Sequence, residues 1–520
     1  MKKDAFIIVG IIVIGLLLYG LTLRGASGNP TADQVKNNLE QPTQAFELSP
    51  ERGRYAQVAS LANTGVYNLS SEWAAVAYPD VGISSGGKID SYFAPGVSYL
   101  ALPFYLFGAR YGLAQVATFS IESFASIITL VFIYIIGRRI FTLPRWGAFF
   151  SMLVYGFAST SWSYAITLYE HSFSAMFAVT MFYAVWRFSQ KENRHAWLYA
   201  AYVWLAYALT ITINYPDALL MLPIMVYLAI STFSFKKLEE GIALSIRWGA
   251  IATFVVFMFV TGLHFWHNTT YYGGWSHVAG TLAGYTPEGA TSTQAMAVAS
   301  STAATTTAAV AGKNAVGFFH ESLIPNSLFI LLFSDQRGLF LFSPIFIFSF
   351  FGIAYAFRKK ELGTAKYVVP LSLIALNLFL YSAWADPWGG WAYGPRYLIQ
   401  SMPWLALFIG VFLSAVPRGR KSFWARGAVF LLFAFSTAIA LVGALTTNAV
   451  PPKSDALTLP IKTYNVLHDV PYIFNNRSGS FIYNTYSSHT ISLTGYFVLI
   501  YSFVILLALI ALCIKEKQYD

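Results

Sequence analysis

The sequence predicts an all-α polytopic membrane protein with about 12 transmembrane helices and cytoplasmic N- and C-termini. Composition is the first observation behind this prediction: 56% of the 520 residues are hydrophobic, 11% are charged, and the mean hydropathy is +0.55. These values lie far outside the range of water-soluble domains. The second observation is that apolar runs of roughly 18 to 22 residues recur along the chain, and a helix of that length crosses a hydrocarbon core of about 30 Å. The third is the distribution of basic residues, which indicates orientation.

The first apolar run follows Met1, Lys2 and Lys3. It is too long for the hydrophobic region of a signal peptide, and no small-residue cleavage site stands out, so we expect a retained helix. The other runs are separated by short polar turns or by longer loops. The predicted transmembrane segments are residues 5–23, 114–136, 146–165, 170–187, 196–213, 217–235, 247–266, 338–357, 365–384, 398–416, 427–447 and 492–514.

Basic residues concentrate on one side of these segments when the N-terminus is placed in the cytoplasm. Of the 33 Lys and Arg residues, 21 then fall inside, mostly in very short loops, and 12 fall outside, in longer loops. This pattern is typical of inner-membrane proteins, because Lys and Arg near helix ends stay in the cytoplasm. We therefore expect a multi-pass protein of the plasma (inner) membrane, whose net charge of +10 needs no nucleic acid to explain it. The single cysteine, Cys513, excludes an internal disulfide and a Cys-based metal site.

Three regions follow from the loop lengths. Residues 1–267 form an N-terminal transmembrane module that includes a long external loop, 24–113, and residues 338–520 form a C-terminal module that includes the external loop 448–491. Between them lies the external loop 268–337, whose Ser/Thr/Ala-rich tract, Thr291 to Gly312, is expected to be flexible because it has almost no bulky side chain to bury. Nearly all non-helical chain is therefore external, and any chemistry is expected there.

The first external loop contains SPERGRYAQVASLANTG, in which Ser49 and Pro50 indicate a helix start. Apolar residues from Tyr55 onward recur at helical spacing, so Glu51 and Arg54 share one face of a short amphipathic helix expected at the membrane surface. The alternative is an exposed i,i+3 ion pair of little energetic weight.

Further along, GGKIDSYFAPGVSYLALPFYLFG predicts a turn followed by a short re-entrant or interfacial helix, because Pro95 and Pro103 interrupt it. Lys88 lies on the Gly-rich turn, where it could equally be an ordinary solvated lysine.

Four ionisable residues lie in or near the outer halves of predicted helices. Glu170 and His171 stand together in TLYEHSFS at the membrane edge, where they face external space or form only a solvated turn. Glu122 and His264 lie deeper in the outer halves of their helices, and ionisable residues at such depth usually face a protein cavity.

Two external turns carry arginines. FSDQRGLFLFSP places Arg337 before the eighth predicted helix, and WADPWGGWAYGPRY places Arg396 between the ninth and tenth. The glycines and prolines of the second turn forbid a regular helix, and irregular backbone at this depth survives only where it lines a wet or protein-enclosed cavity. A fixed arginine there offers a fork of donors for a phosphate or a carboxylate, or else anchors the turn at lipid headgroups. Trp391 and Tyr393 suit either a sugar face or the interfacial aromatic belt.

At these residues the chain resembles the GT-C superfamily of polytopic glycosyltransferases, and within it the branch of lipid A aminoarabinose transferases and protein O-mannosyltransferases. The resemblance implies sugar transfer from a polyprenyl-phosphate donor at the outer membrane face. In ERGRY, Glu51 matches the family's catalytic acid, and Arg54 and Tyr55 match the pair that follows it. The chain departs from the family by carrying Glu51 and Arg52 where Asp, often Asp-Glu, is usual.

The remaining assignments rest on the same resemblance. GGKIDSYFAPG places Lys88 at a donor-phosphate position, and GGWAYGPRYL resembles the bacterial Gly-Pro-Arg motif, which makes Arg396 another phosphate ligand. Arg54 is a third candidate cation, and Glu170 is a second candidate carboxylate. Tyr55, His171, Arg337, Trp391 and Tyr393 are expected to line the substrate pocket. No motif identifies the acceptor.

The expected reaction is inverting transfer of a sugar from a polyprenyl phosphate to a lipid, glycan or protein acceptor. No cofactor is required, although a Mg²⁺ or Mn²⁺ ion bound by carboxylates and phosphate oxygens could assist. The main alternative is a transporter or flippase of a lipid-linked substrate, since about 12 helices are common in transporters. The external position of the irregular turns and the unusual charges, and the absence of a repeat relating the two halves, favour the enzyme. A non-catalytic lipid-phosphate-binding scaffold is the remaining alternative.

Overall fold

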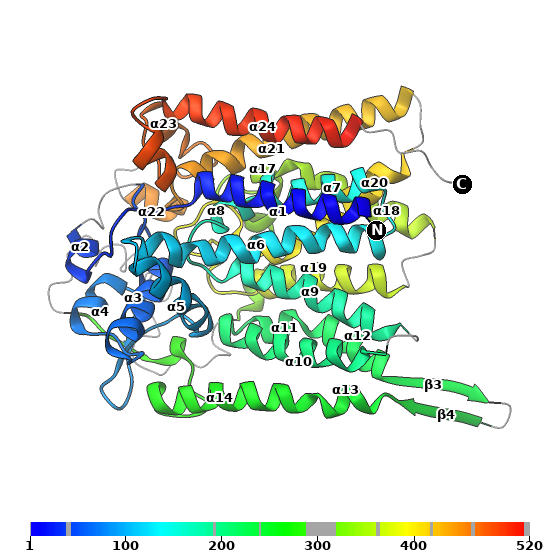
Figure 1. Cartoon of the computed structure of the whole chain (residues 1–520), viewed down its shortest axis with the longest axis horizontal. Helices are drawn as coiled ribbons and strands as arrows, with labels where there is room; N and C mark the ends of the chain where they lie inside the picture. Colours follow the sequence, from blue (N-terminus) through cyan, green and yellow to red (C-terminus); the bar gives the residue numbers. More distant parts are fainter. Residues whose placement is uncertain are drawn as a thin grey trace.

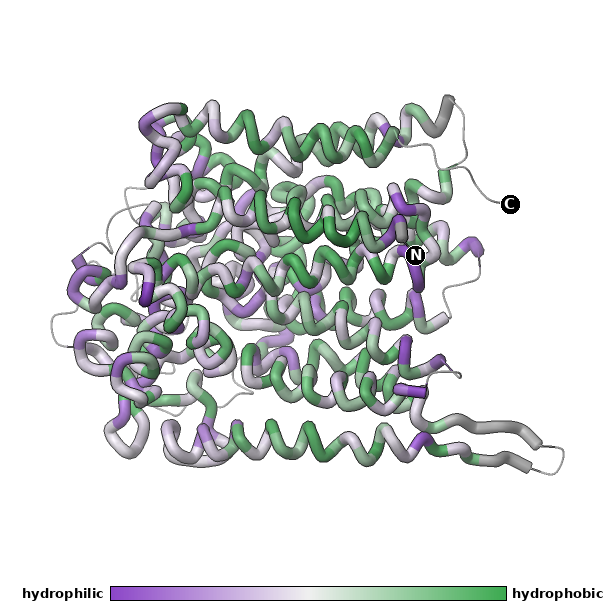
Figure 2. The backbone as a smooth tube through the Cα atoms, viewed as in Figure 1, coloured by the Kyte–Doolittle hydropathy of each residue, from purple (hydrophilic) through white to green (hydrophobic). Residues whose placement is uncertain are grey.

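The structure, a computed structural model, describes residues 2–37, 43–190, 194–238, 241–287, 319–359, 364–416, 420–458 and 463–513. Long helices run side by side along one direction, and a layer of short helices covers one end of them (Figure 1). Hydrophobic residues occupy the middle of the long helices, and hydrophilic residues gather towards the two ends (Figure 2). This banding is expected of an integral membrane protein, because charged groups are costly within the hydrocarbon core. The predicted flexible tract, Thr291 to Gly312, lies outside the described residues.

Eight helical segments in the described part of the chain are long and apolar enough to cross a membrane. Two of them consist of paired elements, in which a short first helix runs into a longer one. They are α1 (Lys2–Thr22), α6 (Ala114–Arg139), α10 (Ala196–Ile213), α13 (Trp248–Ala252) with α14 (Phe254–Tyr272), α19 (Ala365–Ser382), η5 (Arg396–Ser401) with α20 (Met402–Ala415), α21 (Arg420–Leu445) and α24 (Leu493–Cys513).

The other four predicted segments are also helical. Three of them are interrupted, and the fourth, α9, has 19 residues but is not among the helices that are apolar enough to count as candidate spans. Proline residues start several of the new turns, because proline cannot donate the hydrogen bond that would continue a helix. The segments are α7 (Arg145–Phe157) with α8 (Ser161–Tyr164), α9 (His171–Ser189), α11 (Asp217–Leu220) with α12 (Leu222–Thr232), and α17 (Leu339–Phe342) with η4 (Pro344–Phe346) and α18 (Ile347–Arg358). The prediction of a helical membrane protein is confirmed, whereas the count of 12 spans and the orientation stay predictions. The described parts of α1 and α24 begin and end, respectively, at the same end of the bundle (Figure 1).

Short elements make up the covering layer and the connections. The first loop contributes α2 (Ala32–Asn37), α3 (Ser49–Thr64), α4 (Ser71–Ala77), β1 (Val81–Ile83), β2 (Ile89–Ser91) and α5 (Gly96–Ala109). Strands β2, β1 and β5 (Ala283–Gly284) form an antiparallel sheet in that order, and β3 (Phe233–Leu238) pairs with β4 (Gly241–Ile246) at the opposite end of the bundle. The remaining elements are η1 (Ala279–Thr281), η3 (Glu321–Leu323), α16 (Ile324–Leu332), α22 (Lys453–Thr458), α23 (Val470–Phe474) and the π-helical turn η6 (Tyr483–Ser487).

Helix α3 begins at Ser49, as predicted, but it does not lie on a surface. Every residue from 50 to 60 is buried, including the charged Glu51, Arg52 and Arg54. The exposed ion pair between Glu51 and Arg54 considered above is therefore wrong. The physical reason is that the two arginines of this helix have partners elsewhere in the chain, Arg54 in Glu170 and Arg52 in the carbonyl of Tyr78, which the sequence spacing alone does not reveal.

The predicted turn and short helix after Gly86 are confirmed. Residues 85–87 form the turn of the β1–β2 hairpin, and α5 has 14 residues, too few to cross a bilayer. Pro103 lies inside α5 and does not break it.

Arg24 fastens the two halves of the chain together at the end of α1. Its guanidinium is ion-paired with Glu47, and the side chains of the two residues are only 1% and 2% exposed. The same group donates to the carbonyl of Gly443 at 2.9 Å and to Oδ1 of Asn448 at 3.3 Å. Glu47 in turn accepts the backbone N–H of Asn448 at 2.8 Å. One buried charge pair therefore ties the first long loop to the end of α21.

We expect Arg24→Met to destabilise the protein strongly, because it leaves the carboxylate of Glu47 buried without its counter-ion, at a cost of about 3–5 kcal/mol. The measurement is the thermal unfolding midpoint of the detergent-solubilised protein. Arg24→Met combined with Glu47→Gln should recover part of the loss, because no unpaired charge remains. Arg110→Met, an exposed arginine in the same layer, is the control and should change stability by less than about 0.5 kcal/mol. An Arg24→Met protein as stable as this control would contradict the assigned role.

Candidate functional site

An ion pair between Arg54 of α3 and Glu170, the residue before α9, lies at the covered end of the bundle. The Arg54 side chain is 2% exposed and that of Glu170 is 17% exposed. Arg54 also donates to the carbonyl of Pro50 at 3.2 Å, and its guanidinium lies 4.5 Å from the ring centre of Phe93. A desolvated pair of this kind fixes both groups, because separating them would leave two unpaired charges in a poorly solvated place.

Arg396 joins this pair across the ring of Tyr169. Its guanidinium carbon lies 5.6 Å from the Tyr169 ring centre, and that of Arg54 lies 5.9 Å from the same ring. Arg396 also stands over the ring of Tyr397 at 5.3 Å. The buried Nε of Arg396 has no hydrogen-bond partner among the described residues. Two cations and one carboxylate therefore surround one aromatic ring, which leaves an excess of positive charge.

The turn that carries Arg396 is fixed by Asp386 and Arg337. Asp386 accepts the backbone N–H of Trp388 at 3.1 Å and that of Gly390 at 2.6 Å. Arg337 donates to the carbonyls of Trp388 at 2.9 Å, Gly390 at 3.0 Å and Val450 at 2.9 Å. Burial lowers the pKa of Arg337 to about 10, which still leaves it charged at neutral pH. The two arginine-bearing turns therefore meet, and two of the four hydrogen bonds that the Arg337 guanidinium donates hold the second turn in shape.

Trp391 and Tyr393 attach the same turn to its surroundings. The indole N–H of Trp391 donates to Oδ2 of Asp455 at 2.8 Å, and the hydroxyl of Tyr393 donates to the carbonyl of Ile439 at 2.6 Å. Tyr393 is fully buried and its ring packs edge-on against Phe342. The polar atoms of both side chains are thus engaged by protein, while their assignment to a substrate pocket stays a prediction.

Glu51 lies in an environment that favours its neutral form. Its Oε1 accepts the backbone N–H of Leu48 at 2.9 Å, whereas its Oε2 has no partner in the described part of the chain. Burial, and then the charge of nearby Glu47, raise the pKa of Glu51 to about 7. Burial and the charge of Glu51 likewise raise the pKa of Tyr169, which links Glu51 electrostatically to the ring between the two arginines. Glu51 is therefore a carboxyl that can take up or release a proton near neutral pH.

His171 and Tyr55 lie beside these groups. The His171 ring is stacked on Tyr169 with ring centres 5.9 Å apart, and its Nε2 lies 3.8 Å from Oε1 of Glu170. Tyr55 packs in the core between Phe46 and Tyr105.

Lys88 makes its contacts elsewhere, at the end of α14. Its exposed ammonium donates to the carbonyl of Thr270 at 2.6 Å and lies 5.3 Å from the ring centre of Tyr271. In this conformation the lysine supports the β1–β2 hairpin against α14, and its phosphate role stays a prediction.

Sequence reasoning missed three contributors: Tyr169, Glu47 and Phe93. Tyr169 stands directly before Glu170, and Glu47 precedes Glu51 by one helical turn, so adjacency to a proposed site residue was the available signal. Among the residues that the structure describes, no three His, Cys, Asp or Glu side chains come together as a metal-binding group. Assistance by a Mg²⁺ or Mn²⁺ ion stays a prediction.

Residues 94–265 match the family of dolichyl-phosphate-mannose-protein mannosyltransferases. An oligosaccharyltransferase from Archaeoglobus fulgidus, crystallised with a tethered acceptor peptide, is similar in structure with a TM-score of 0.50 and 12% identity, over 87% of this chain. The predicted resemblance to GT-C glycosyltransferases is confirmed. At this identity the archaeal structure shows a shared fold, and the chain spans only 57% of the archaeal protein's length.

ArnT from Cupriavidus metallidurans, crystallised with undecaprenyl phosphate, has a TM-score of 0.46 and 13% identity, over 97% of this chain and 77% of its own. No curated protein matches the sequence.

The raised pKa of Glu51 makes stability depend on pH. A carboxyl that holds its proton more tightly in the folded state than in the unfolded state stabilises the fold only below the folded pKa, and the benefit declines as pH rises from about 4.5 to about 7. We expect Glu51→Gln to be increasingly more stable than the parent over this interval, by on the order of 3 kcal/mol at most. The amide oxygen of glutamine can still accept the Leu48 N–H.

The measurement is the difference in unfolding midpoint between Glu51→Gln and the parent from pH 5 to pH 8. Glu72→Gln, an exposed glutamate on α4, is the matched control and should show no comparable trend. A constant difference for Glu51→Gln would mean that Glu51 is charged throughout this range.

Proposed function

We propose that this protein is an inverting glycosyltransferase that moves a sugar from a polyprenyl-phosphate donor to an acceptor at the extracytoplasmic face of the membrane. The single observation that carries the proposal is the group formed by Arg54, Glu170 and Arg396 around Tyr169 at one end of the helices. The match of residues 94–265 to the dolichyl-phosphate-mannose-protein mannosyltransferases supports the donor class. It also includes Glu170 and His171.

The leaving group accounts for the two arginines. When the bond between the anomeric carbon and the phosphate oxygen breaks, negative charge develops on the lipid phosphate, and fixed cations lower the barrier most where charge develops. Arg396 is the first candidate for this role, because its Nε has no protein partner and its charge is not neutralised by a direct ion pair in the described structure. Arg54 is already paired with Glu170, so its charge is compensated and its main role is to hold the site together.

The acceptor must lose a proton as it attacks the anomeric carbon, and Glu51 is the carboxyl suited to receive it. A pKa near 7 places Glu51 close to the pH at which a general base works best. The acceptor oxygen or nitrogen forms the new bond to the sugar, its proton passes to Glu51, and the donor oxygen leaves with the phosphate. Attack from the face opposite the phosphate inverts the anomeric centre. Glu170 is the second candidate, and its pairing with Arg54 makes it the weaker base.

A transporter or flippase of a lipid-linked substrate is the competing proposal, since it too would bind a lipid phosphate at a charged turn. The two proposals differ in their requirement for Glu51, because transport needs no general base. They also differ in their product, which for a transferase is free polyprenyl phosphate.

The test combines donor-phosphate binding with turnover in the purified protein. We expect undecaprenyl monophosphate to raise the unfolding midpoint of the parent in a concentration-dependent way. Arg396→Gln should weaken the apparent affinity about tenfold, and Lys88→Ala tests the second predicted ligand. Glu51→Gln should bind as the parent does but release free polyprenyl phosphate from a polyprenyl-phosphate-linked sugar about 10²–10⁴ times more slowly. Equal responses of the parent and Arg396→Gln would remove the phosphate site, and a parent that never turns over donor would favour transport.

Gly389 and Gly390 offer a matched pair of variants that test the position of Arg396. Both glycines have left-handed backbone conformations, with φ of +68° and +61°, so alanine at either position strains the turn by about 1–2 kcal/mol. A Cβ on Gly389 would lie 2.7 Å from Nε of Arg396, whereas a Cβ on Gly390 would meet nothing within 4 Å. We expect similar losses of stability but a several-fold loss of undecaprenyl phosphate affinity only in Gly389→Ala. Equal affinities would place the ligand away from Arg396.

A further inference from the structure

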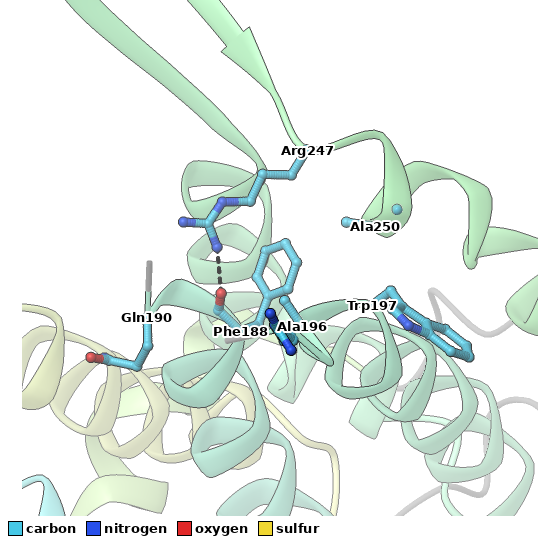
Figure 3. Close-up of a pocket in the computed structure, with 8 residues that line it drawn as sticks. Phe188, Gln190, Ala196, Trp197, Arg247 and Ala250 are labelled. Carbon is cyan, nitrogen blue, oxygen red and sulfur yellow. Dashed lines mark hydrogen bonds between the residues drawn. The ribbon is translucent and has the colours of Figure 1, made fainter. Parts of the chain in front are cut away.

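A separate pocket opens at the end of the bundle opposite Arg54 and Arg396. It has a volume of about 360 Å³ and lies where α9 ends, α10 begins and the chain leaves β4 for α13. Figure 3 shows Arg247 above Phe188 and Gln190, with Ala196 and Trp197 on α10 and Ala250 on α13. Nothing in the proposed transfer reaction uses this end of the molecule.

Arg194 and Arg247 give the pocket a positive lining. Arg247 is hydrogen-bonded to the end of α9. Its guanidinium donates to the carbonyl of Phe188 and, at 3.3 Å, to the carbonyl of Ser189. Arg194 is exposed and makes no hydrogen bond or ion pair within the described part of the chain. None of the pocket's lining residues is acidic. One arginine is therefore fixed in place, and the other is available to a ligand.

The pocket lies at the depth where lipid headgroups are expected. Helix α10 and the segment formed by α13 and α14 are both long and apolar enough to cross a membrane, and the pocket lies between their starting points. Trp197 is 51% exposed and Trp248 is 69% exposed beside it, and tryptophan collects at the boundary between hydrocarbon and headgroups. Ala196 and Trp197 are the first residues of α10, so its positive helix end adds to the field of the arginines.

We propose that this pocket binds a phosphate group of the kind carried by an anionic phospholipid headgroup, with Arg194 and Arg247 as its ligands. Arginine suits this role because its planar fork of donors matches phosphate oxygens. The small side chains of Ala196, Gly249 and Ala250 leave the room that the headgroup occupies. This pocket is distinct from the proposed donor site. If the pocket binds no lipid phosphate, the proposed glycosyl transfer is not affected.

Native mass spectrometry of the full chain in detergent tests this site. The protein is mixed with phosphatidylglycerol or with phosphatidylcholine of the same acyl chains, and the retained lipid is counted. We expect the parent to retain more phosphatidylglycerol, and Arg194→Gln to lose at least about threefold of that retention. Arg139→Gln is the matched control, because it removes the same charge from an exposed arginine at the end of α6, outside the pocket. It should bind lipid as the parent does.

Two results would overturn the proposal. One is equal retention of the two lipids by the parent, and the other is an equal loss in Arg194→Gln and Arg139→Gln, which would indicate general surface attraction. A third arm adds soluble glycerol 3-phosphate. Failure of this compound to displace phosphatidylglycerol at millimolar concentration supports a membrane source for the phosphate. If glycerol 3-phosphate displaces phosphatidylglycerol in a way that depends on Arg194, the pocket binds phosphate, but the assignment of that phosphate to a lipid is overturned.

Discussion

The ion pair between Arg54 and Glu170 is the interaction on which the covered end of this protein depends. It joins a helix of the first loop to the start of a membrane helix, in a place where neither charge could be left alone. Arg24 and Glu47 apply the same constraint, and extend it to the segment that follows α21. Buried charges thus determine how the covering layer sits, because each one is satisfied only when segments from distant parts of the chain come together.

This constraint also explains which parts of the structure could be predicted from sequence. Hydropathy located the helical segments well, and α10 occupies the predicted residues 196–213, because a spanning helix satisfies its own backbone and needs only length and apolarity. The start of α3 at Ser49 was also predictable, because Ser49 and Pro50 give a local signal for a helix start. The burial of α3 was not predictable, because the partner of Arg54 lies 116 positions away and that of Arg24 in a loop whose position has no local signal.

The candidate site contains residues whose polar atoms hold the protein in shape and residues whose polar atoms can still bind a ligand. Arg337, Trp391 and Tyr393 were predicted as pocket residues, yet their polar atoms bind backbone carbonyls or Asp455. Arg396, by contrast, has a buried Nε without a partner and stands beside rings instead of carboxylates. Sequence patterns identify residues that are able to bind a ligand. Only the hydrogen bonds in the structure distinguish side chains that already bind protein groups from those that can still bind a ligand.

The balance of charges around Tyr169 favours binding of the phosphate of the proposed donor there. Glu170 cancels Arg54 directly, so Arg396 is the charge that remains uncompensated in a poorly solvated setting. A lipid phosphate would restore neutrality there at little cost, since the site has already been desolvated by folding. The proposed proton transfer to Glu51 fits the same charge balance. Burial and its proximity to Glu47 favour its neutral form, so accepting a proton from an attacking acceptor relieves an unfavourable charge in the protein at the moment when the phosphate gains one. The two halves of the reaction would each move the site towards electrical balance.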